Sequence, residues 1–360
     1  MTVNVGVVGA SGFAGGETVR ILSNHPNVNL NYITSRRLIG KYFHSVYPNL
    51  RNIVEYKFEE FNINTAQKKC DIIFLATPHG ISQDIVPSLL EVGLKVIDLS
   101  ADFRLKNLDI YKKYYKRNHS HPELFQEAVY GLPELHRDEI KDAHLIAVAG
   151  CHASSAIYGL YPLVQENLID TSKIIVDSKT GSSGSGKGIN ESTHHSIRAN
   201  SIRPYKMTGH RHTAEIEQEL ERILKDKNNE EEKVKIGFSA HAVNLVRGIL
   251  STCHVFFPNN IEINEKMLFR TYRKAFREEP FLRLINQNTG VFRLPDPKVI
   301  VGTNYCDVGF QLDDHLNRIV ILCTLDNIVK GTAGNAIQSM NIMLNISEKA
   351  GLDFPGYFPS

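Results

Sequence analysis

The chain has 360 residues, more than one hydrophobic core usually supports, so two domains are expected. Its composition, 42% hydrophobic and 22% charged residues, is that of an ordinary soluble globular protein, and a formal net charge of +2 gives no reason to expect a nucleic-acid partner. No apolar run approaches the roughly 18 residues that a membrane-spanning helix needs, so no membrane partner is expected either.

The cysteines are odd in number and lack the spacing of a disulfide framework or a metal site. No basic and apolar leader opens the chain, so we expect a cytoplasmic protein whose thiols stay reduced. The thiols are Cys70, Cys151, Cys253, Cys306 and Cys323.

A glycine-rich turn lies between the first predicted strand, Val3 to Val8, and a predicted helix that includes residues 17–22. This order indicates a dinucleotide site, because glycine lets the backbone approach a pyrophosphate and the helix N-terminus faces its charge. The spacing G-x-x-G-x-x-G is less diagnostic than G-x-G-x-x-G, and a purely structural turn is the alternative. The expected cofactor contacts are Ala10, Ser11, Gly12, Phe13 and Gly15.

The second predicted strand, around Leu30 to Ile33, ends where the adenosine ribose of a dinucleotide is recognised. An NAD site usually carries Asp or Glu there, whereas this chain has Thr34, Ser35 and Arg36. Hydroxyl groups and a guanidinium suit a 2′-phosphate, because arginine makes paired hydrogen bonds to phosphate oxygens. The expected cofactor is therefore NADP(H), with a basic surface turn as the alternative interpretation.

Three more apolar runs, beginning at Asp71, Lys95 and Leu145, read as strands that alternate with helices. This alternation predicts an α/β fold with a Rossmann-type, doubly wound parallel sheet in the amino-terminal domain. The basic run from Arg104 to His121 is either a solvated face or a surface that docks an acidic partner.

Cys151 stands where a buried strand ends, at Gly150, and where a helix with Ile157, Leu160 and Leu163 on one face begins. The N–H groups and positive dipole end of a helix N-terminus favour a thiolate over a thiol. For a single cysteine, however, a small buried core thiol is the commoner case. Whether Cys151 is a nucleophile or a core residue therefore has to be judged from the motifs around it.

The sequence pattern is different in the second half of the chain. A strand that starts near Lys173 leads into a glycine- and serine-rich loop, 181–188, which is either a solvent linker or a loop that faces an anion or the nicotinamide through Gly184. Later runs predict an α+β domain with a mostly antiparallel sheet, with strands at 234–242, 249–257 and 318–325 and a helix at 266–277.

Histidines and basic residues gather between residues 194 and 215. His210 and His212 share a face if their segment is extended, and Thr213 can cap a helix that begins at Ala214, with Glu215 in its first turn. A general acid–base histidine beside anion-binding arginines fits this pattern. A zinc pair would lack third and fourth ligands, so no metal is expected, and a basic surface corner is the remaining alternative.

Six segments, read in chain order, are similar to motifs of the N-acetyl-γ-glutamyl-phosphate reductase family, within the aspartate-semialdehyde-dehydrogenase-like superfamily. The resemblance runs from residue 6 to the end of the chain. The segments are Gly9-Ala-Ser-Gly12-Phe-Ala-Gly15-Gly16-Glu17, Asp98-Leu-Ser-Ala-Asp-Phe-Arg104, Tyr130-Gly-Leu-Pro-Glu134, Gly150-Cys151, Gly209-His-Arg-His212 and Lys330-Gly-Thr-Ala-Gly-Asn335.

Two departures from the family pattern are informative. Members that act on the acetylated substrate usually have Pro-Gly-Cys-Tyr-Pro-Thr and His-Arg-His-x-Pro-Glu, where this chain has Ala149-Gly-Cys-His-Ala-Ser154 and Ala214. The chain instead resembles the branch whose substrate is attached to a small acidic amino-group carrier protein of the LysW type, which serves lysine synthesis through aminoadipate and, in some archaea, arginine synthesis. The acetylated branch is the alternative.

The resemblance implies an NADPH-dependent reduction of an aminoadipyl or glutamyl phosphate to the semialdehyde, through a thioester on Cys151. It also implies that His212, with Glu215, is the acid–base residue, with His210 in reserve, and that Asn327 contacts the nicotinamide. Arg198, Arg203 and Lys206, with the basic run, would steer a carrier of negative surface. The candidates for substrate binding are Arg104, Arg198, Arg203, Lys206 and Arg211.

We expect an NADP-binding domain at residues 1–150, completed by a carboxyl-terminal helix within 327–360, and a catalytic domain at 151–326, in a homodimer or homotetramer. Two other classes of function compete with the reductase. A dinucleotide-sensing regulator would have no use for Cys151 beside His212, and an ordinary aldehyde dehydrogenase would oxidise a semialdehyde without depending on phosphate.

Overall fold

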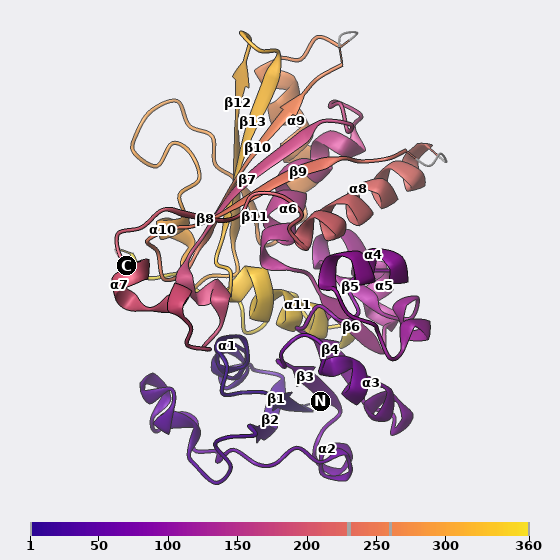
Figure 1. The fold of residues 1–360 in the computed structure, drawn as a ribbon, viewed down its shortest axis with the longest axis vertical. Helices are drawn as coiled ribbons and strands as arrows, with labels where there is room; N and C mark the ends of the chain where they lie inside the picture. Colours follow the sequence, from indigo (N-terminus) through magenta and orange to yellow (C-terminus); the bar gives the residue numbers. More distant parts are fainter. Residues whose placement is uncertain (1, 229–231, 259–260, 359–360) are drawn as a thin grey trace. The chain divides into compact units, whose positions relative to one another are not determined.

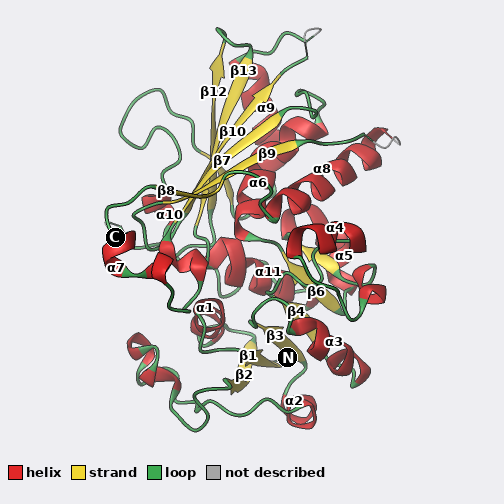
Figure 2. Cartoon of the chain, in the orientation of Figure 1, coloured by secondary structure: helices red, strands yellow, loops and turns green. Residues whose placement is uncertain are grey.

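The structure is a computed structural model that describes residues 2–228, 232–258 and 261–358. The chain divides into two compact units, Met1–Ala149 with Thr332–Phe354, and Gly150–Gly331 with Pro355–Ser360 (Figures 1 and 2). Within the described ranges, no helix is long and apolar enough to cross a membrane.

The first unit contains a six-stranded sheet in the order β2-β1-β3-β4-β6-β5, and every neighbouring pair is parallel. All four residues of β3 and of β6 are apolar and buried, as expected for strands covered on both faces. The predicted Rossmann-type sheet is confirmed. Its strands are β1 (Val3–Val8), β2 (Val28–Thr34), β3 (Ile72–Leu75), β4 (Lys95–Asp98), β5 (Val129–Gly131) and β6 (Leu145–Val148).

Helices join the strands of the first unit, and one further helix of this unit, α11, comes from the carboxyl-terminal part of the chain. The helices of the first unit are α1 (Phe13–Leu22), α2 (Ile63–Lys69), α3 (Ser82–Glu91), α4 (Leu108–Tyr115), α5 (Pro133–Asp142) and α11 (Gly334–Met343), and its 3₁₀ turns are η1 (Phe43–Ser45), η2 (Pro48–Leu50) and η3 (Pro122–Phe125). Helix α11 is buried along its whole length and packs against α5 and β6. Gln338 donates hydrogen bonds to Glu134 (3.0 Å) and Glu348 (2.9 Å), which fixes α11 against α5.

The second unit contains a seven-stranded sheet in the order β11-β12-β13-β10-β7-β9-β8. Only the β11–β12 and β7–β9 pairs are parallel, so the predicted, mostly antiparallel sheet is confirmed. Strand β12 was not predicted, because its glycine and acidic residues weaken the strand pattern. The strands are β7 (Ile174–Thr180), β8 (Arg203–Lys206), β9 (Ile236–Ala242), β10 (Ile249–Phe256), β11 (Leu282–Leu284), β12 (Cys306–Asp313) and β13 (Arg318–Leu325).

One face of this sheet is covered by helices. Helix α6 (Cys151–Gln165) packs against β10, β12 and β13 and is flanked by α8 (His212–Asn228) and α9 (Glu265–Phe276). Along β10, buried residues alternate with partly exposed ones, so the opposite face is open in the single chain. The remaining elements are short: η4 (Ser182–Ser185), η5 (Glu191–Thr193), α7 (His195–Arg198), α10 (Pro297–Ile300) and the π-helical turn η6 (Val329–Ala333).

Two buried carboxylates connect the loops at the carboxyl edge of the first sheet. The Ser82 hydroxyl lies 2.9 Å from a carboxylate oxygen of both Asp98 and Asp102, between which it shares its one proton, while Asp98 also accepts from the Ser100 hydroxyl (2.7 Å) and Asp102 from the Gly80 N–H (2.7 Å). Burial, followed by the charge of Asp102, raises the pKa of Asp98 to about 6. The family segment that begins at Asp98 therefore holds the loops after β3 and β4 together.

Asp98→Asn should change how the free energy of unfolding depends on pH. Because the folded-state pKa of Asp98, about 6, lies above the unfolded value of about 3.9, the folded state binds more protons between these pH values. The contribution of Asp98 to stability should therefore decrease by up to about 2–3 kcal/mol as pH rises from about 4 to about 6, and the variant lacks this contribution, so its free energy of unfolding should rise relative to that of the wild type across this range. Urea titrations across this range measure the slope of this free energy against pH.

The exposed Asp142, at the end of α5, provides a control for this measurement. Asp142→Asn should keep the wild-type slope. An Asp98→Asn protein with an unchanged slope would contradict the assignment of the raised pKa to Asp98.

Candidate active site

The glycine turn occupies the carboxyl end of β1, which lies between β2 and β3 in the sheet. Gly9 has a φ of +83°, and a Cβ atom there would lie 2.4 Å from the carbonyl oxygen of Ala76. A Cβ atom at Gly15 would lie 2.5 Å from the carbonyl oxygen of Gly9. Both positions therefore require glycine, and the turn stands at a strand edge where the direction of connection reverses, the usual ligand position of such sheets.

The end of β2 is bonded directly to this turn. The Ala10 N–H donates to the Thr34 carbonyl (3.0 Å), and the hydroxyls of Ser11 and Ser35 are hydrogen-bonded at 2.9 Å. Thr34 and Ser35 are buried and Arg36 is exposed. Gly12 is the N-cap of α1 and Phe13 its first residue, so the structure brings the predicted residues of the turn and of β2 together at one edge.

Tyr47 is a residue of this edge that the sequence did not reveal. Its hydroxyl donates to the carbonyl of Gly12 (2.5 Å) and lies 3.2 Å from that of Ser11. Its ring occupies the space where a side chain at Gly16 would stand, with 2.1 Å between the ring and a Cβ atom there. A tyrosine 35 residues from the carbonyl to which it donates carries no local pattern, so only the fold identifies it.

In the second unit, Cys151 is the first residue of α6, and Gly150 is its N-cap. Cys151 is partly exposed, whereas the other four thiols are buried. A Cβ atom at Gly331 would lie only 2.7 Å from the Cβ atom of Cys151, so the backbone of the turn η6 approaches the thiol as closely as a glycine allows. The predicted strand-to-helix position of Cys151 is therefore confirmed.

Glu215 connects the start of α6 to the start of α8. Its side chain is fully buried, and Oε2 accepts a hydrogen bond from the Gly150 N–H at 2.9 Å. Its other oxygen, Oε1, lies 3.8 Å from Nε2 of His212. Helix α8 begins at His212, so the prediction that it begins at Ala214 with Thr213 as its cap was wrong. The earlier start puts His212 and Glu215 one turn apart on the same helix face.

The two histidines of the predicted cluster are in different environments. The backbone N–H of His212 donates to Nδ1 of His210 at 3.2 Å, and the centroids of the two rings are 4.8 Å apart. Burial, followed by the charges of Arg211 and Lys206, lowers the pKa of His210 to about 4. His210 is therefore neutral near pH 7 and is stacked on Phe238 at 4.8 Å.

His152 and Tyr205 belong to the same cluster but were not predicted as site residues. His152 Nε2 lies 3.2 Å from the Tyr205 hydroxyl, and its Nδ1 lies 2.7 Å from Oγ of Ser178. Burial and then the charge of Cys151 raise the pKa of Tyr205 to about 12. The position of His152 directly after Cys151 was the only sequence signal for either residue.

The predicted substrate-binding residues are dispersed. Arg198 donates to the carbonyls of Thr180 and Val243, both at 3.1 Å, and Arg203 donates to the Ser192 carbonyl at 3.1 Å. Lys206 and Arg211 are exposed and close enough to His210 to lower its pKa. Arg104 lies in the first unit, where it is buried and donates to the Leu99 carbonyl at 3.1 Å.

Asn327 and Gly184 are neighbours in the second unit. The Asn327 side chain accepts from the Gly248 N–H (2.8 Å) and donates to Ser183 Oγ (2.9 Å). A Cβ atom at Gly184 would lie 3.8 Å from Nδ2 of Asn327. Asn327 therefore holds the glycine- and serine-rich loop 181–188 through Ser183. Over the ranges that the structure describes, no group of three or more His, Cys, Asp or Glu residues is arranged to hold a metal ion.

The geometry of the second unit suits covalent catalysis by a thiol. A partly exposed cysteine stands at a helix N-terminus, where the thiolate is favoured, with a histidine and a buried carboxylate on the adjacent helix. The first unit supplies a glycine turn that fits a dinucleotide pyrophosphate.

The comparisons with known proteins agree with this division of the chain. Residues 4–143 match the family model described as "Semialdehyde dehydrogenase, NAD binding domain", and residues 151–327 match "Semialdehyde dehydrogenase, dimerisation domain". The chain belongs to the semialdehyde dehydrogenase family, as predicted, and it is an oxidoreductase with an NAD(P)-binding domain.

Two relatives are similar over nearly their whole length. One, from Nitrosopumilus maritimus, is a "Putative [LysW]-L-2-aminoadipate/[LysW]-L-glutamate phosphate reductase", 47% identical over 99% of this chain and 100% of the relative. A "[LysW]-L-2-aminoadipate/[LysW]-L-glutamate phosphate reductase" from Saccharolobus solfataricus is 43% identical over 97% of each chain. The crystal structure of aspartate semialdehyde dehydrogenase with NADP from Candida albicans has the same fold, with a TM-score of 0.69, 17% identity and coverage of 98% and 99% of the two chains.

Alkylation should distinguish Cys151 from the other thiols. Burial raises the pKa of Cys70 to about 12 and that of Cys253 still higher, whereas Cys151 is partly exposed at a helix N-terminus. We expect iodoacetamide at pH 7 to modify Cys151 at least about tenfold faster than any other cysteine, as measured by peptide mass spectrometry.

Cys151→Ser should abolish the fast phase of this labelling, and Cys70→Ser should leave it unchanged. Labelling of all thiols at one common slow rate would identify Cys151 as an inert residue.

Proposed function

We propose that this protein reduces [LysW]-bound aminoadipyl phosphate, glutamyl phosphate or both to the corresponding semialdehyde, with NADPH as the reductant and with release of phosphate. The observation that carries the proposal is the arrangement of Cys151, Glu215 and His212 in a chain that is similar along its full length to reductases of this name. The reaction belongs to lysine biosynthesis, arginine biosynthesis or both, in the cytoplasm.

Cys151 carries the covalent chemistry in this proposal. Its thiolate attacks the acyl carbon, the bond from that carbon to the phosphate oxygen breaks, and a thioester forms. NADPH, when bound, supplies the hydride that reduces this thioester. The resulting hemithioacetal oxyanion collapses to the aldehyde and returns the thiolate of Cys151. The overall reaction consumes one proton, which the departing phosphate takes up.

His212 is the residue that we assign to this proton transfer. Glu215 faces its ring at 3.8 Å and can stabilise the imidazolium form. His210 is less suited, because one of its nitrogens accepts from the His212 N–H and the other lies 3.5 Å from the Tyr205 hydroxyl. Lys206 and Arg211, both exposed beside this cluster, are candidates for the substrate phosphate and carboxylate, and Asn327 for the nicotinamide end of the cofactor.

NADP(H) is the cofactor that the first unit favours. The joined hydroxyls of Ser11 and Ser35 and the exposed Arg36 stand at the end of β2, where a dinucleotide places its adenosine ribose. An acidic residue that would pair with an unmodified 2′-hydroxyl is missing from the segment 34–37. These groups are complementary to a 2′-phosphate.

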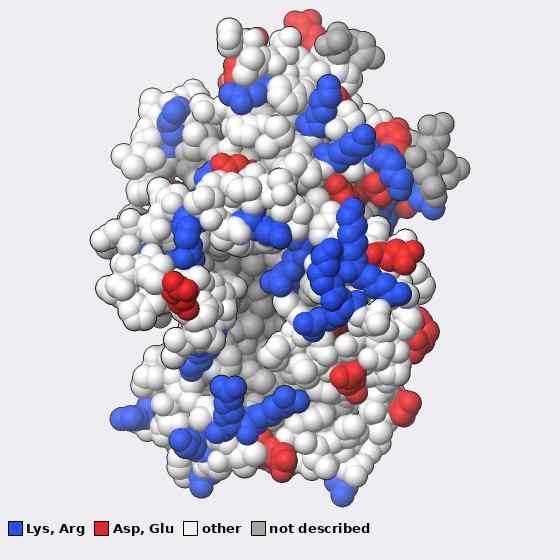
Figure 3. All heavy atoms as spheres, viewed as in Figure 1, with Lys and Arg blue, Asp and Glu red and all other residues white. Residues whose placement is uncertain are grey.

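The carrier that holds the substrate is the expected partner, and we propose the surface of α4 as its docking site. Lys112, Lys113, Lys116 and Arg117 are exposed there, and Figure 3 shows lysine and arginine side chains gathered over this helix. Arg117 donates to the His79 carbonyl at 2.6 Å, which ties this basic surface to the loop after β3. A carrier with a negative surface would therefore be held beside the ligand edge of the first unit.

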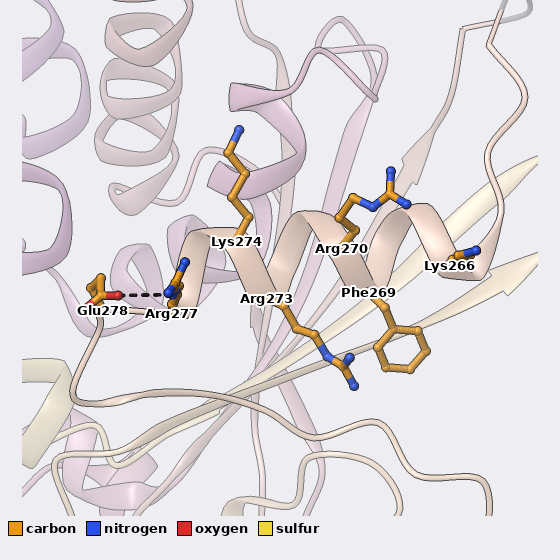
Figure 4. Close-up of a pocket in the computed structure, with 7 residues that line it drawn as sticks. All are labelled: Lys266, Phe269, Arg270, Arg273, Lys274, Arg277 and Glu278. Carbon is orange, nitrogen blue, oxygen red and sulfur yellow. Dashed lines mark ion pairs between the residues drawn. The ribbon is translucent and has the colours of Figure 1, made fainter.

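A second basic surface, on α9, serves as a comparison. Lys266, Arg270, Arg273 and Lys274 project from one helix, next to the ion pair of Arg277 with Glu278 (3.3 Å; Figure 4). This surface lies at the carboxyl-terminal end of α6, where Lys274 pairs with Glu166 at 2.7 Å. At about 1.5 Å per residue, that end of α6 is about 20 Å from Cys151. A carrier docked on α9 would be distant from the thiol.

Assembly of the chain into a homodimer or homotetramer is part of the proposal. The family model names the second unit a dimerisation domain, and the open face of its sheet carries the partly exposed residues of β10 and β13, including Leu250, Val320 and Leu322. A second copy would cover these apolar residues.

The substrate assignment is tested by measuring oxidation of NADPH, and of NADH for comparison, with three acyl phosphates: carrier-bound aminoadipyl, carrier-bound glutamyl and N-acetylglutamyl. We expect turnover with one or both carrier-bound substrates and a clear preference for NADPH. Cys151→Ser should lower turnover by at least about 10³-fold while leaving NADPH binding intact. Substantial turnover by Cys151→Ser would sink the nucleophile assignment, and turnover with N-acetylglutamyl phosphate alone would assign the protein to the acetylated branch.

Charge reversal tests the docking surface. Replacement of Lys112, Lys113 and Lys116 by Glu should raise KM for the carrier-bound substrate by about tenfold or more at low salt, with little change in kcat. The matched control reverses Arg270, Arg273 and Lys274 on α9 and should leave KM unchanged. The opposite result would move docking to α9, and no effect of either variant would rule out both surfaces.

A further inference from the structure

A chain of hydrogen bonds runs behind Cys151 from the interior of the second unit to its surface. Ser251 and Ser178 are in contact through their hydroxyls at 3.0 Å, and Ser178 reaches Nδ1 of His152 at 2.7 Å. Nε2 of His152 reaches the Tyr205 hydroxyl at 3.2 Å, and that hydroxyl lies 3.5 Å from Nε2 of His210. This series of hydrogen bonds joins α6, which carries the thiol, to β7, β8 and the segment that leads into α8.

One backbone contact determines which atom donates and which accepts in each of these hydrogen bonds. The His212 N–H can only donate, so Nδ1 of His210 accepts and carries no proton. His210 is buried and neutral, and its proton must therefore be on Nε2, which donates to the oxygen of Tyr205. The phenol proton is then directed to Nε2 of His152, and the proton on Nδ1 of His152 is directed to Ser178.

We propose that His152 is a positioning residue that accepts the proton of Tyr205 and so keeps this phenol from donating to the thiolate of Cys151. The same hydrogen bond holds the Tyr205 oxygen where it accepts from His210, and thereby keeps His210 in the form that binds the His212 N–H. The role in turnover rests on the proposed function, whereas the proton positions do not.

This arrangement matters because the Tyr205 hydroxyl lies 3.2 Å from the ring of His152, the residue that directly follows Cys151. A phenol that donated to the thiolate would stabilise it and make it a weaker nucleophile, since nucleophilicity falls as the pKa of a thiol falls. A buried neutral histidine behind the tyrosine removes this competing donor. Of the three histidines His152, His210 and His212, His212 is then the one whose ring faces a carboxylate of the cluster, that of Glu215 at 3.8 Å.

The proton positions can be read directly in ¹⁵N spectra of the full-length protein labelled at histidine, with signals assigned through His152→Gln and His210→Gln. We expect His152 in the Nδ1–H form and His210 in the Nε2–H form, both neutral at pH 6.5 because burial lowers their pKa values. His152 in the Nε2–H form, or protonated near pH 6.5, would overturn the proposal whether or not the reductase assignment is correct.

Kinetics test the consequence for the thiol. His152→Phe should lower kcat about tenfold and slow the limiting rate of Cys151 alkylation by a similar factor, with KM for NADPH unchanged. Tyr205→Phe in the same chain should restore the alkylation rate, and His152→Gln, whose carbonyl can accept from Tyr205, should retain most of the wild-type kcat.

These variants separate positioning from simple destabilisation. If the second substitution slows alkylation further, or if His152→Gln is as impaired as His152→Phe, His152 supports the fold and does not direct the phenol. A wild-type protein that shows no reductase activity but has the expected tautomers would overturn the proposed function and leave the hydrogen-bond chain in place.

Discussion

The arrangement of the second unit depends on one buried carboxylate. Glu215 accepts the N–H of Gly150, an N–H that would otherwise be an unsatisfied donor at the start of α6, and the same carboxylate faces His212. A buried carboxylate is costly unless it is hydrogen-bonded, so this position favours a structure in which both contacts are made together. The start of the helix that carries Cys151 and the start of the helix that carries His212 are therefore positioned by one side chain.

The first unit shows a comparable constraint made from backbone. A Cβ atom at Gly9 or Gly15 would lie only 2.4–2.5 Å from a backbone oxygen, so no larger residue fits at either position. The end of β2 is hydrogen-bonded to the same turn. Hydroxyls and an exposed arginine stand next to it. The carboxylates of Asp98 and Asp102 fix the following loops in the same way, by accepting N–H and hydroxyl donors. Both units thus use small residues for close approach and buried acids for fixation.

The proposed reaction gives these constraints a common purpose. A thiolate must be available as a nucleophile, a proton must reach the departing phosphate, and no other proton donor should compete for the sulfur. His210 and His152 are neutral because they are buried, and the contacts of Tyr205 connect them. Basic residues that are exposed, such as Lys206 and Arg211, remain available for the anionic substrate. Burial therefore separates the residues that position the site from those that can meet a ligand.

The sequence by itself determined the Rossmann-type sheet, the mostly antiparallel second sheet, the glycine turn and the place of Cys151, because each depends on local periodicity or on a short motif. It could not identify Tyr47, Tyr205, the close approach of Gly331 to Cys151 or the role of His152, because their partners are distant in the chain or lie on other elements. It also started α8 two residues late, since the bond from Glu215 to Gly150 that fixes this start links residues 65 positions apart. Local pattern specifies which elements form, whereas hydrogen bonds between distant residues decide which side chains meet at the thiol.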